Sequence, residues 1–263
     1  MTLIIGIVAE NGIVVASDGV ATLGNLGQFT ARQQTKKLSI VQSKAIVGVS
    51  GPVGLGQMLT GELDRLLKDP ATFTDKQPDQ VMSLISQRFR TILFPELQAA
   101  QVTFQLIGGT ARDSAISFSI VALPVNNNPY LFQFNQQGSP EQANDGLPFV
   151  AIGSGQQIAD PFLAFIRRNF WKDRLPTIGE AEFAAMWTLE QAIQTNPGGI
   201  GDPKQMMVLR KAEDHWIAEE LEPEQLEEHQ ESVKNMEDYI ANYDKTTEEE
   251  DDEALPEIPT PDK

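Results

Sequence analysis

The strongest constraint on the fold is the order in which strand-like and helix-like segments follow one another. Short apolar runs rich in Ile and Val come in blocks, and longer helical patterns come in pairs between those blocks. Asn11-Gly12 between the first two runs is a strong hairpin signal. Strands are expected at 2–9, 13–17, 37–41, 45–49, 102–108, 115–123, 129–135, 148–152, 205–210 and 215–218, and helices at 53–67, 79–99, 156–171 and 179–194.

This order favours one layered architecture. Strands joined by hairpins form antiparallel sheets, and paired amphipathic helices must cover those sheets in layers. The sequence therefore predicts an α+β fold, a four-layer αββα sandwich of two antiparallel sheets between helical layers. A doubly wound parallel sheet would need stricter alternation of strands and helices. The polar stretch 19–35 is interpreted as a connection between strands.

Composition excludes several kinds of catalytic site. The 263 residues include no cysteine, and both histidines, His215 and His229, lie near the C-terminus. The first 212 residues therefore cannot hold a Ser-His-Asp or Cys-His arrangement, or a histidine-rich metal site. No metal and no cofactor are expected. No apolar run approaches membrane-spanning length and no signal peptide is recognisable, so we expect a cytoplasmic protein without membrane or nucleic-acid partners.

The net charge of −17 belongs entirely to the C-terminal segment. Residues 1–212 hold 17 basic and 17 acidic side chains, whereas residues 213–263 hold 3 basic and 20 acidic ones. We divide the chain into a body at 1–220, an acidic amphipathic helix at 221–244 and a disordered acidic tail at 245–263. A thin apolar stripe along that helix leaves two alternatives open, docking on its own body or contact with a neighbouring subunit; its members are Leu226, Val233, Met236, Ile240 and Tyr243.

The start of the chain carries a candidate nucleophile. Thr2 follows Met1 directly, and removal of an initiator methionine is favoured when the next residue is small. The resulting terminus would hold a hydroxyl nucleophile and a free α-amine able to take its proton. Because residues 1–212 contain neither His nor Cys, that amine is the most plausible base for a hydroxyl nucleophile there.

Four further segments combine polar groups with strand ends. Asp18 ends the second strand, and Lys36-Lys37 precede an apolar strand, where only one lysine can face inward and needs a carboxylate partner. Gly48-Val49-Ser50-Gly51 ends a strand and can present backbone N–H groups, and Gly153-Ser154-Gly155 lies between a strand and a helix.

Taken together, these motifs resemble the proteasome β-subunit family, and within it the bacterial HslV peptidases. The resemblance covers about residues 2–211 and rests on motifs in a fixed order: Thr2, Gly6-Ile7, Asn11-Gly12, Ser17-Asp18-Gly19, Ala21-Thr22-Leu23-Gly24-Asn25, Lys36-Lys37-Leu38, Val47-Gly48-Val49-Ser50-Gly51 and Ala151-Ile152-Gly153-Ser154-Gly155. It implies an N-terminal-nucleophile hydrolase fold and stacked rings of identical subunits with the threonines facing an inner chamber.

The resemblance also implies roles for single residues. Thr2 would be the nucleophile, Asp18 the acid beside the buried Lys37, Gly48 the donor to the oxyanion, and Ser154 a neighbour of the terminal amine. Three further residues would contact substrate: the backbone of Thr22 would hold the substrate strand, and Ile46 and Ser50 would line the first specificity pocket. A cation such as Lys37 lowers the pKa of an α-amine from about 7.7–8.0, so that the amine is neutral near pH 7.

The implied function is a threonine endopeptidase acting on peptides or unfolded proteins. A non-catalytic ring subunit and an amidase acting on a small amide stay open as alternatives, and so does the existence of an ATP-dependent unfoldase partner. Two departures from the family stand out. The stretch between Asp18 and Lys37 is longer than is typical, which leaves Lys36 as a second candidate, and Thr195-Asn196 replaces an Asp-x-x-Ser motif common near the amine.

Overall fold

The computed structural model describes residues 2–25, 28–108, 115–172, 174–196 and 199–243, with residues 22–25, 28–32, 70 and 107 described by their backbone only. Two five-stranded sheets dominate this part of the chain. The first has the strand order β10-β1-β2-β11-β12, formed by β1 (Ile4–Ala9), β2 (Gly12–Ser17), β10 (Phe149–Ile152), β11 (Gln205–Ala212) and β12 (His215–Glu220). The second has the order β5-β6-β7-β8-β9, formed by β5 (Leu38–Val41), β6 (Ala45–Ser50), β7 (Phe118–Val125), β8 (Asn128–Phe134) and β9 (Pro140–Gln142).

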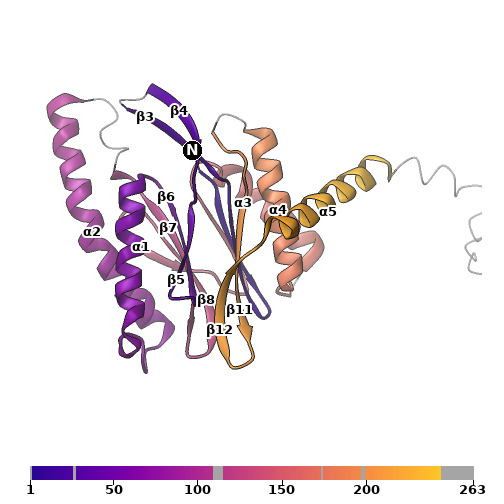
Figure 1. Cartoon of the computed structure of the whole chain (residues 1–263), viewed down its shortest axis with the longest axis horizontal. Coiled ribbons are helices and arrows are strands. Elements are labelled where there is room, and N and C mark those ends of the chain that lie inside the picture. The colour runs from indigo at the N-terminus through magenta and orange to yellow at the C-terminus, as the bar shows by residue number, and fades with distance from the viewer. Residues whose placement is uncertain (1, 26–27, 109–114, 173, 197–198, 244–263) are drawn as a thin grey trace, which may run out of the picture.

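The two sheets pack face to face, and a helical layer covers each outer face (Figure 1). Helices α1 (Val53–Lys68) and α2 (Pro78–Ile107) cover the second sheet, whereas α3 (Gln156–Ile166) and α4 (Ile178–Thr195) cover the first. All strand pairs are antiparallel within the described residues. The predicted four-layer αββα sandwich is therefore confirmed.

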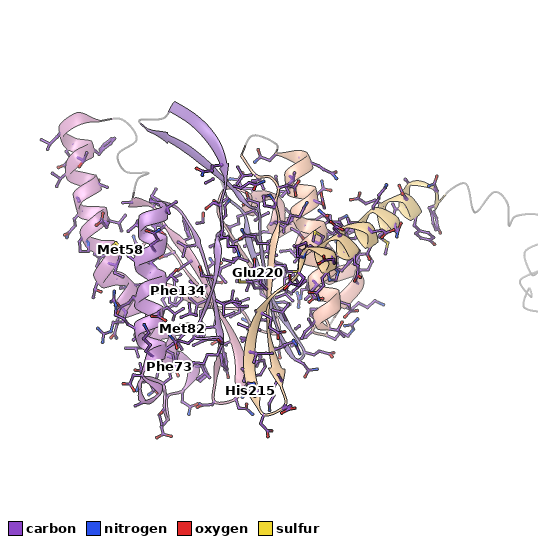
Figure 2. All side chains as sticks on the ribbon, viewed as in Figure 1. Met58, Phe73, Met82, Phe134, His215 and Glu220 are labelled. Atoms are coloured by element: carbon purple, nitrogen blue, oxygen red, sulfur yellow. The ribbon has the colours of Figure 1, made fainter. Side chains whose placement is uncertain are left out.

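Three apolar clusters fill the three spaces between these layers. Alternate residues of one strand serve different clusters, because successive side chains point to opposite faces of a sheet. Ile4 and Ile46 pack between the sheets, whereas Ile5 packs against α3 and α4. Phe134, Met82 and Phe73 belong to the cluster under α1 and α2, where Figure 2 shows them.

Two sequence predictions of secondary structure were wrong. The polar stretch 19–35 forms a hairpin of β3 (Val20–Asn25) and β4 (Gln28–Gln34), which pair with each other and lie outside the two large sheets. The segment 102–108, predicted as a strand, continues α2 as far as Ile107. Two of its apolar side chains are exposed there (Val102 54%, Leu106 78%), so they do not fill a sheet face.

The acidic helix α5 (Pro223–Ala241) docks on its own body through side chains from Leu226 to Glu237. Val233 is 2% exposed and packs with α4, and Trp187 Nε1 donates to Glu237 Oε1 at 2.9 Å. The C-terminal end of α5 points away from the sandwich (Figure 1), and Ile240 is 55% exposed. Docking on the body thus accounts for part of the apolar stripe, while the predicted tail at 245–263 lies outside the described residues. No helix in the described ranges has the length and apolar character needed to cross a membrane.

Candidate active site

Thr2 is held at the head of β1 by the turn between β10 and α3. Thr2 N donates to Ser154 Oγ at 3.1 Å, and Gly155 N donates to Thr2 O at 3.2 Å. With Met1 attached, Thr2 N is a peptide nitrogen; removal of Met1 would turn the same atom into an α-amine. Ser154 therefore lies beside the nitrogen that would serve as the base, as the sequence predicted.

The two glycines around Ser154 allow this close approach. Gly153 has φ +95°, and a Cβ added there would lie 2.2 Å from Thr2 O. A Cβ on Gly155 would lie 2.8 Å from Leu3 Cβ. Any larger residue at these positions would push the turn away from β1, so the Gly-Ser-Gly sequence places the Ser154 hydroxyl next to Thr2.

Asp18 is the centre of the hydrogen-bond network beside Thr2. Its side chain is fully buried, and it directly follows β2, where the chain turns into β3. Four groups donate to its carboxylate: Leu3 N at 2.9 Å and Lys37 Nζ at 2.6 Å to Oδ1, and Val20 N at 3.3 Å and Gly201 N at 3.4 Å to Oδ2. Asp18 thereby fixes the residue that follows Thr2 and positions a lysine in the same network.

Gly19 lets the loop after α4 reach Asp18. A Cβ on Gly19 would lie 2.0 Å from Pro203 O, so no other residue fits without moving that loop. Gly19 N donates to Gly201 O at 3.0 Å. The loop thus supplies the Gly201 N–H to the carboxylate, a partner that the sequence analysis missed. Thr195, which the sequence analysis singled out just before this loop, donates its hydroxyl to Gln191 O within α4.

Lys37, and not Lys36, faces inward. The Lys37 side chain is 6% exposed and pairs with Asp18, whereas Lys36 is 70% exposed and pairs with Glu220 at 2.9 Å. Burial lowers the pKa of Lys37 below its ordinary value, and the Asp18 carboxylate opposes this shift. A buried cation of this kind disfavours a second positive charge nearby, so it would keep a neighbouring amine neutral.

A groove of about 940 Å³ contains both Thr2 and Lys37 in its walls. Its other walls come from the β4–β5 connection, β5 and α1, with Thr35 and Ile40 on one side and Gln57 and Thr60 on the other. Thr2 is half-buried and borders this groove, so a ligand lying between β5 and α1 would lie next to it.

The expected substrate-contacting residues have different outcomes. Ile46 is fully buried between the two sheets and is not among the residues that line the groove, so the expectation that it lines a specificity pocket was wrong; its position in β6 turns the side chain inward. Ser50 is 8% exposed. A Cβ added to Gly153 would lie 3.0 Å from Ser50 Oγ and 2.2 Å from Thr2 O, so the Ser50 hydroxyl lies near Thr2. The backbone of Thr22 pairs with Arg32, and its side chain lies outside the described part.

Gly48 lies in β6 opposite Leu38 of β5. An added Cβ would lie 2.9 Å from Ile4 Cγ2, so the glycine lets β6 and β1 approach closely. Its role as a donor to an oxyanion stays a proposal.

Neither histidine takes part in this arrangement. His215 lies at the tip of the β11–β12 hairpin, at the opposite end of the sandwich from the N-terminus (Figures 1 and 2). His229 faces Glu182, with its Nε2 3.3 Å from Glu182 Oε2. A side-chain imidazole is therefore not available as a base for Thr2.

Comparison with known proteins shows to which family this chain belongs. The model of the family described as "Proteasome subunit" matches residues 2–194. This chain belongs to the proteasome subunit family. Two curated relatives are both described as proteasome subunit beta. The one from Methanococcus vannielii is 28% identical over 160 residues, which make up 60% of this chain and 63% of that protein. The one from Ferroglobus placidus is 26% identical over 86% of this chain and 92% of that protein.

Solved structures of Anbu, described as an ancestral β-subunit, share the fold of this family member. Anbu from Yersinia bercovieri superposes with a TM-score of 0.67 at 15% identity, over 98% of this chain and all of that one. Anbu from Pseudomonas aeruginosa, in a structure described as a helical assembly, gives 0.64 at 15% identity over 98% of each chain. At 15% identity the likeness to Anbu establishes the fold alone. The resemblance of the sequence motifs to HslV stays an expectation.

Proposed function

We propose that this chain is a threonine-type peptidase in which Thr2, exposed at the N-terminus by removal of Met1, is the nucleophile. The observation that carries the proposal is the convergence on one terminal threonine of Ser154, Asp18 and the buried Lys37. Ser154 contacts Thr2 N, the atom that must act as the base, while Asp18 binds the next backbone nitrogen, Leu3 N, and carries Lys37 on the same carboxylate.

The chemistry follows from these positions. The α-amine takes the proton of Thr2 Oγ, and Oγ attacks the carbonyl carbon of a peptide bond. Backbone N–H groups stabilise the oxyanion, a role we assign to Gly48, and loss of one such donor typically costs about 10²–10³ in rate. The C–N bond then breaks as the amine returns its proton to the leaving nitrogen, and water hydrolyses the remaining ester.

The groove favours peptides over small amides as substrates. Its volume of about 940 Å³ lies at the upper end of the roughly 300–1,000 Å³ found for small-molecule sites, and it runs between a strand and a helix. An extended segment of several residues fits such a shape, whereas a single small amide would leave most of it unfilled.

We extend the proposal to self-assembly in the cytoplasm. The helical assembly described for Anbu from Pseudomonas aeruginosa supports an oligomer of identical subunits. A repeated head-to-tail interface gives a closed ring when its rotation closes and an open helix when it does not. Imaging of the purified protein by negative-stain electron microscopy distinguishes a stacked ring, an open helix and a lone protomer. Whether an ATP-dependent unfoldase delivers substrates is tested by adding candidate unfoldases to that assembly.

The direct test compares wild type with Thr2→Ala on fluorogenic peptides and on a threonine-directed covalent inhibitor. We expect hydrolysis and inhibitor labelling at Thr2 in wild type and neither in Thr2→Ala, while Thr91→Ala, at an exposed threonine of α2, behaves as wild type. Intact mass must show that Met1 is absent. Retention of Met1 with no labelling would favour a non-catalytic subunit, and hydrolysis unchanged by Thr2→Ala would exclude this nucleophile.

A further inference from the structure

Gln205, at the start of β11, connects the two sheets beside the candidate active site. Its side chain is buried, with the residue 7% exposed. In the ladder between β11 and β2, Gln205 lies opposite Ser17, the residue before Asp18. A polar side chain therefore begins a strand whose next four residues, 206–209, are apolar, and it lies opposite the residue before the carboxylate that binds Lys37.

Both ends of the Gln205 amide bind the segment that carries Lys37. Oε1 accepts from Lys37 N at 3.0 Å and from Leu38 N at 3.4 Å, and Nε2 donates to Thr35 O at 2.9 Å. Ser17 Oγ also donates to Oε1 at 3.4 Å. The amide thus contacts the backbone on both sides of Lys36-Lys37, where the chain leaves β4 and enters β5.

The location explains why a side chain is needed there. Thr35 is the last residue tied to the β3–β4 hairpin, through Thr35 N and Gly19 O at 2.9 Å, and the β5–β6 ladder begins at Leu38. Between them the backbone crosses from one sheet to another, so Gln205 supplies the partners that a neighbouring strand would otherwise supply. Unpaired buried backbone groups would each carry a desolvation cost.

We infer that Gln205 is a positioning residue for the proposed hydrolysis, because it fixes the Lys37 backbone at the place from which Nζ reaches Asp18. Lys37 Nζ and Asp18 Oδ1 are 2.6 Å apart, and this pair borders the Leu3 amide next to the nucleophile. Release of the backbone at Lys37 would let the ammonium leave its buried position. This inference rests on the proposed function and adds a residue that the sequence motifs did not contain.

The other charged side chains near the crossing from β4 to β5 are held by partners other than Gln205. Asp18 faces Lys37 from β2, and Lys36 points outward to Glu220 of β12. Lys204, next to Gln205, pairs with Glu190 at 2.8 Å and Asp202 at 2.6 Å. Among the described charged groups, Lys37 is therefore the cation that a change at Gln205 would displace relative to Asp18.

The test uses two substitutions and a structural control in the full chain. Gln205→Met keeps the length without hydrogen-bonding groups, and Gln205→Asn keeps the amide but shortens its reach. Ser86→Ala removes a buried hydroxyl that donates to Gly138 O at 2.6 Å on the α2 side of the sandwich, which is a comparable loss away from Thr2.

We expect both Gln205 variants to lower kcat and the rate of inhibitor labelling by about 10- to 100-fold. The acid limb of the pH–rate profile should move to higher pH, because the amine pKa rises when the cation withdraws and more base is needed to deprotonate it. Ser86→Ala should lower stability without moving that limb. An acid limb at the wild-type position in a folded, assembled Gln205 variant would overturn the inference.

A second readout separates this inference from the proposed function. Nitrogen-15 lysine NMR, with the Lys37 signal assigned by Lys37→Arg, follows Lys37 without any need for turnover. Since burial is the main cause of the lowered Lys37 pKa, we expect that pKa to rise towards its ordinary value in the Gln205 variants. A wild type that shows no Thr2-dependent hydrolysis would contradict the proposed function, whereas an unchanged Lys37 titration would contradict the role of Gln205.

Discussion

Lys37 Nζ and Asp18 Oδ1 lie 2.6 Å apart, and the two side chains are only 6% and 0% exposed. The pair joins two sheets, since Asp18 directly follows β2 of the first sheet and Lys37 directly precedes β5 of the second. Three backbone N–H groups complete the carboxylate's hydrogen bonds. The ion pair is therefore both a link between the sheets and the electrostatic setting of Thr2.

Lys37→Met should destabilise the protein by about 3–5 kcal/mol, because it leaves the Asp18 carboxylate buried without its cation. Urea unfolding followed by circular dichroism measures the change. Lys36→Met is the matched control: its pair with Glu220 is exposed, so the loss should be about 0–1 kcal/mol. Equal losses in the two variants would contradict the buried pairing.

Gly153→Ala should impair both folding and labelling of Thr2. The residue has φ +95° and the new Cβ would approach Thr2 O, so the backbone strain of about 1–3 kcal/mol falls on the segment that carries the nucleophile. Gly54→Ala, at a helical position with open space, should be neutral or stabilise by up to about 1 kcal/mol. Thermal unfolding and inhibitor labelling of both variants check this, and normal labelling of folded Gly153→Ala would count against the described turn.

Glu180→Gln should lower stability near pH 7 and lose its effect in acid. Arg174 binds both carboxylate oxygens of Glu180, at 2.7 and 2.5 Å, and this pairing lowers the pKa of Glu180 to about 2. A carboxyl group with a depressed pKa stabilises the fold above its ordinary value of 4.5, and the stabilisation disappears as the pH falls towards 2. Because both side chains are partly exposed, we expect about 1 kcal/mol or less at pH 7.

The measurement for Glu180 is urea unfolding of wild type and Glu180→Gln at several pH values between 7 and 2.5. The difference between the two proteins should narrow steadily over the acid part of this range. Arg174 and the Thr177 N–H at the helix cap both favour the ionised carboxylate of Glu180, so a difference that stays constant with pH would contradict a stabilising role for that charge.

Val233→Asp should detach α5 from α4. Val233 is 2% exposed, and a buried unpaired carboxylate there would cost about 3 kcal/mol or more. Limited proteolysis within α5 and the fluorescence of Trp187, which donates to Glu237 of α5, report the detachment. Ile240→Asp, at a position 55% exposed, should leave both readouts of the isolated protomer unchanged; early cleavage in that variant would contradict the docking described.

The sequence predicted the sandwich because its apolar patterns are local. Strands such as β1 and β6 and helices such as α4 carry their periodicity within a few residues, and the Asn11-Gly12 turn defines one pairing directly. The run from Val102 to Leu106 alternates like a strand, yet it follows a helix already formed from Pro78, and continuation of that helix prevails.

The candidate site was only partly predictable. Thr2, Asp18, Lys37 and Ser154 were found from motifs, and the structure brings all four together. Gly201 and Gln205 were missed because their contacts join segments more than 160 residues apart, and only the polar residue heading an apolar strand hinted at Gln205. Ile46 was misassigned because a motif does not say to which face of a strand a side chain points.

Because of the β3–β4 hairpin, the number of residues between Asp18 and Lys37 does not set the distance between them. Its base is closed beside the site, where Val20 pairs with Gln34 and Thr35 N bonds to Gly19 O. Residues added to its arm lengthen the hairpin outward, and a bulge between Leu23 and Gly24 accommodates an unmatched one. The long stretch between Asp18 and Lys37 therefore leaves their separation unchanged, and the arm is free to vary in length while the chemistry at its base stays the same.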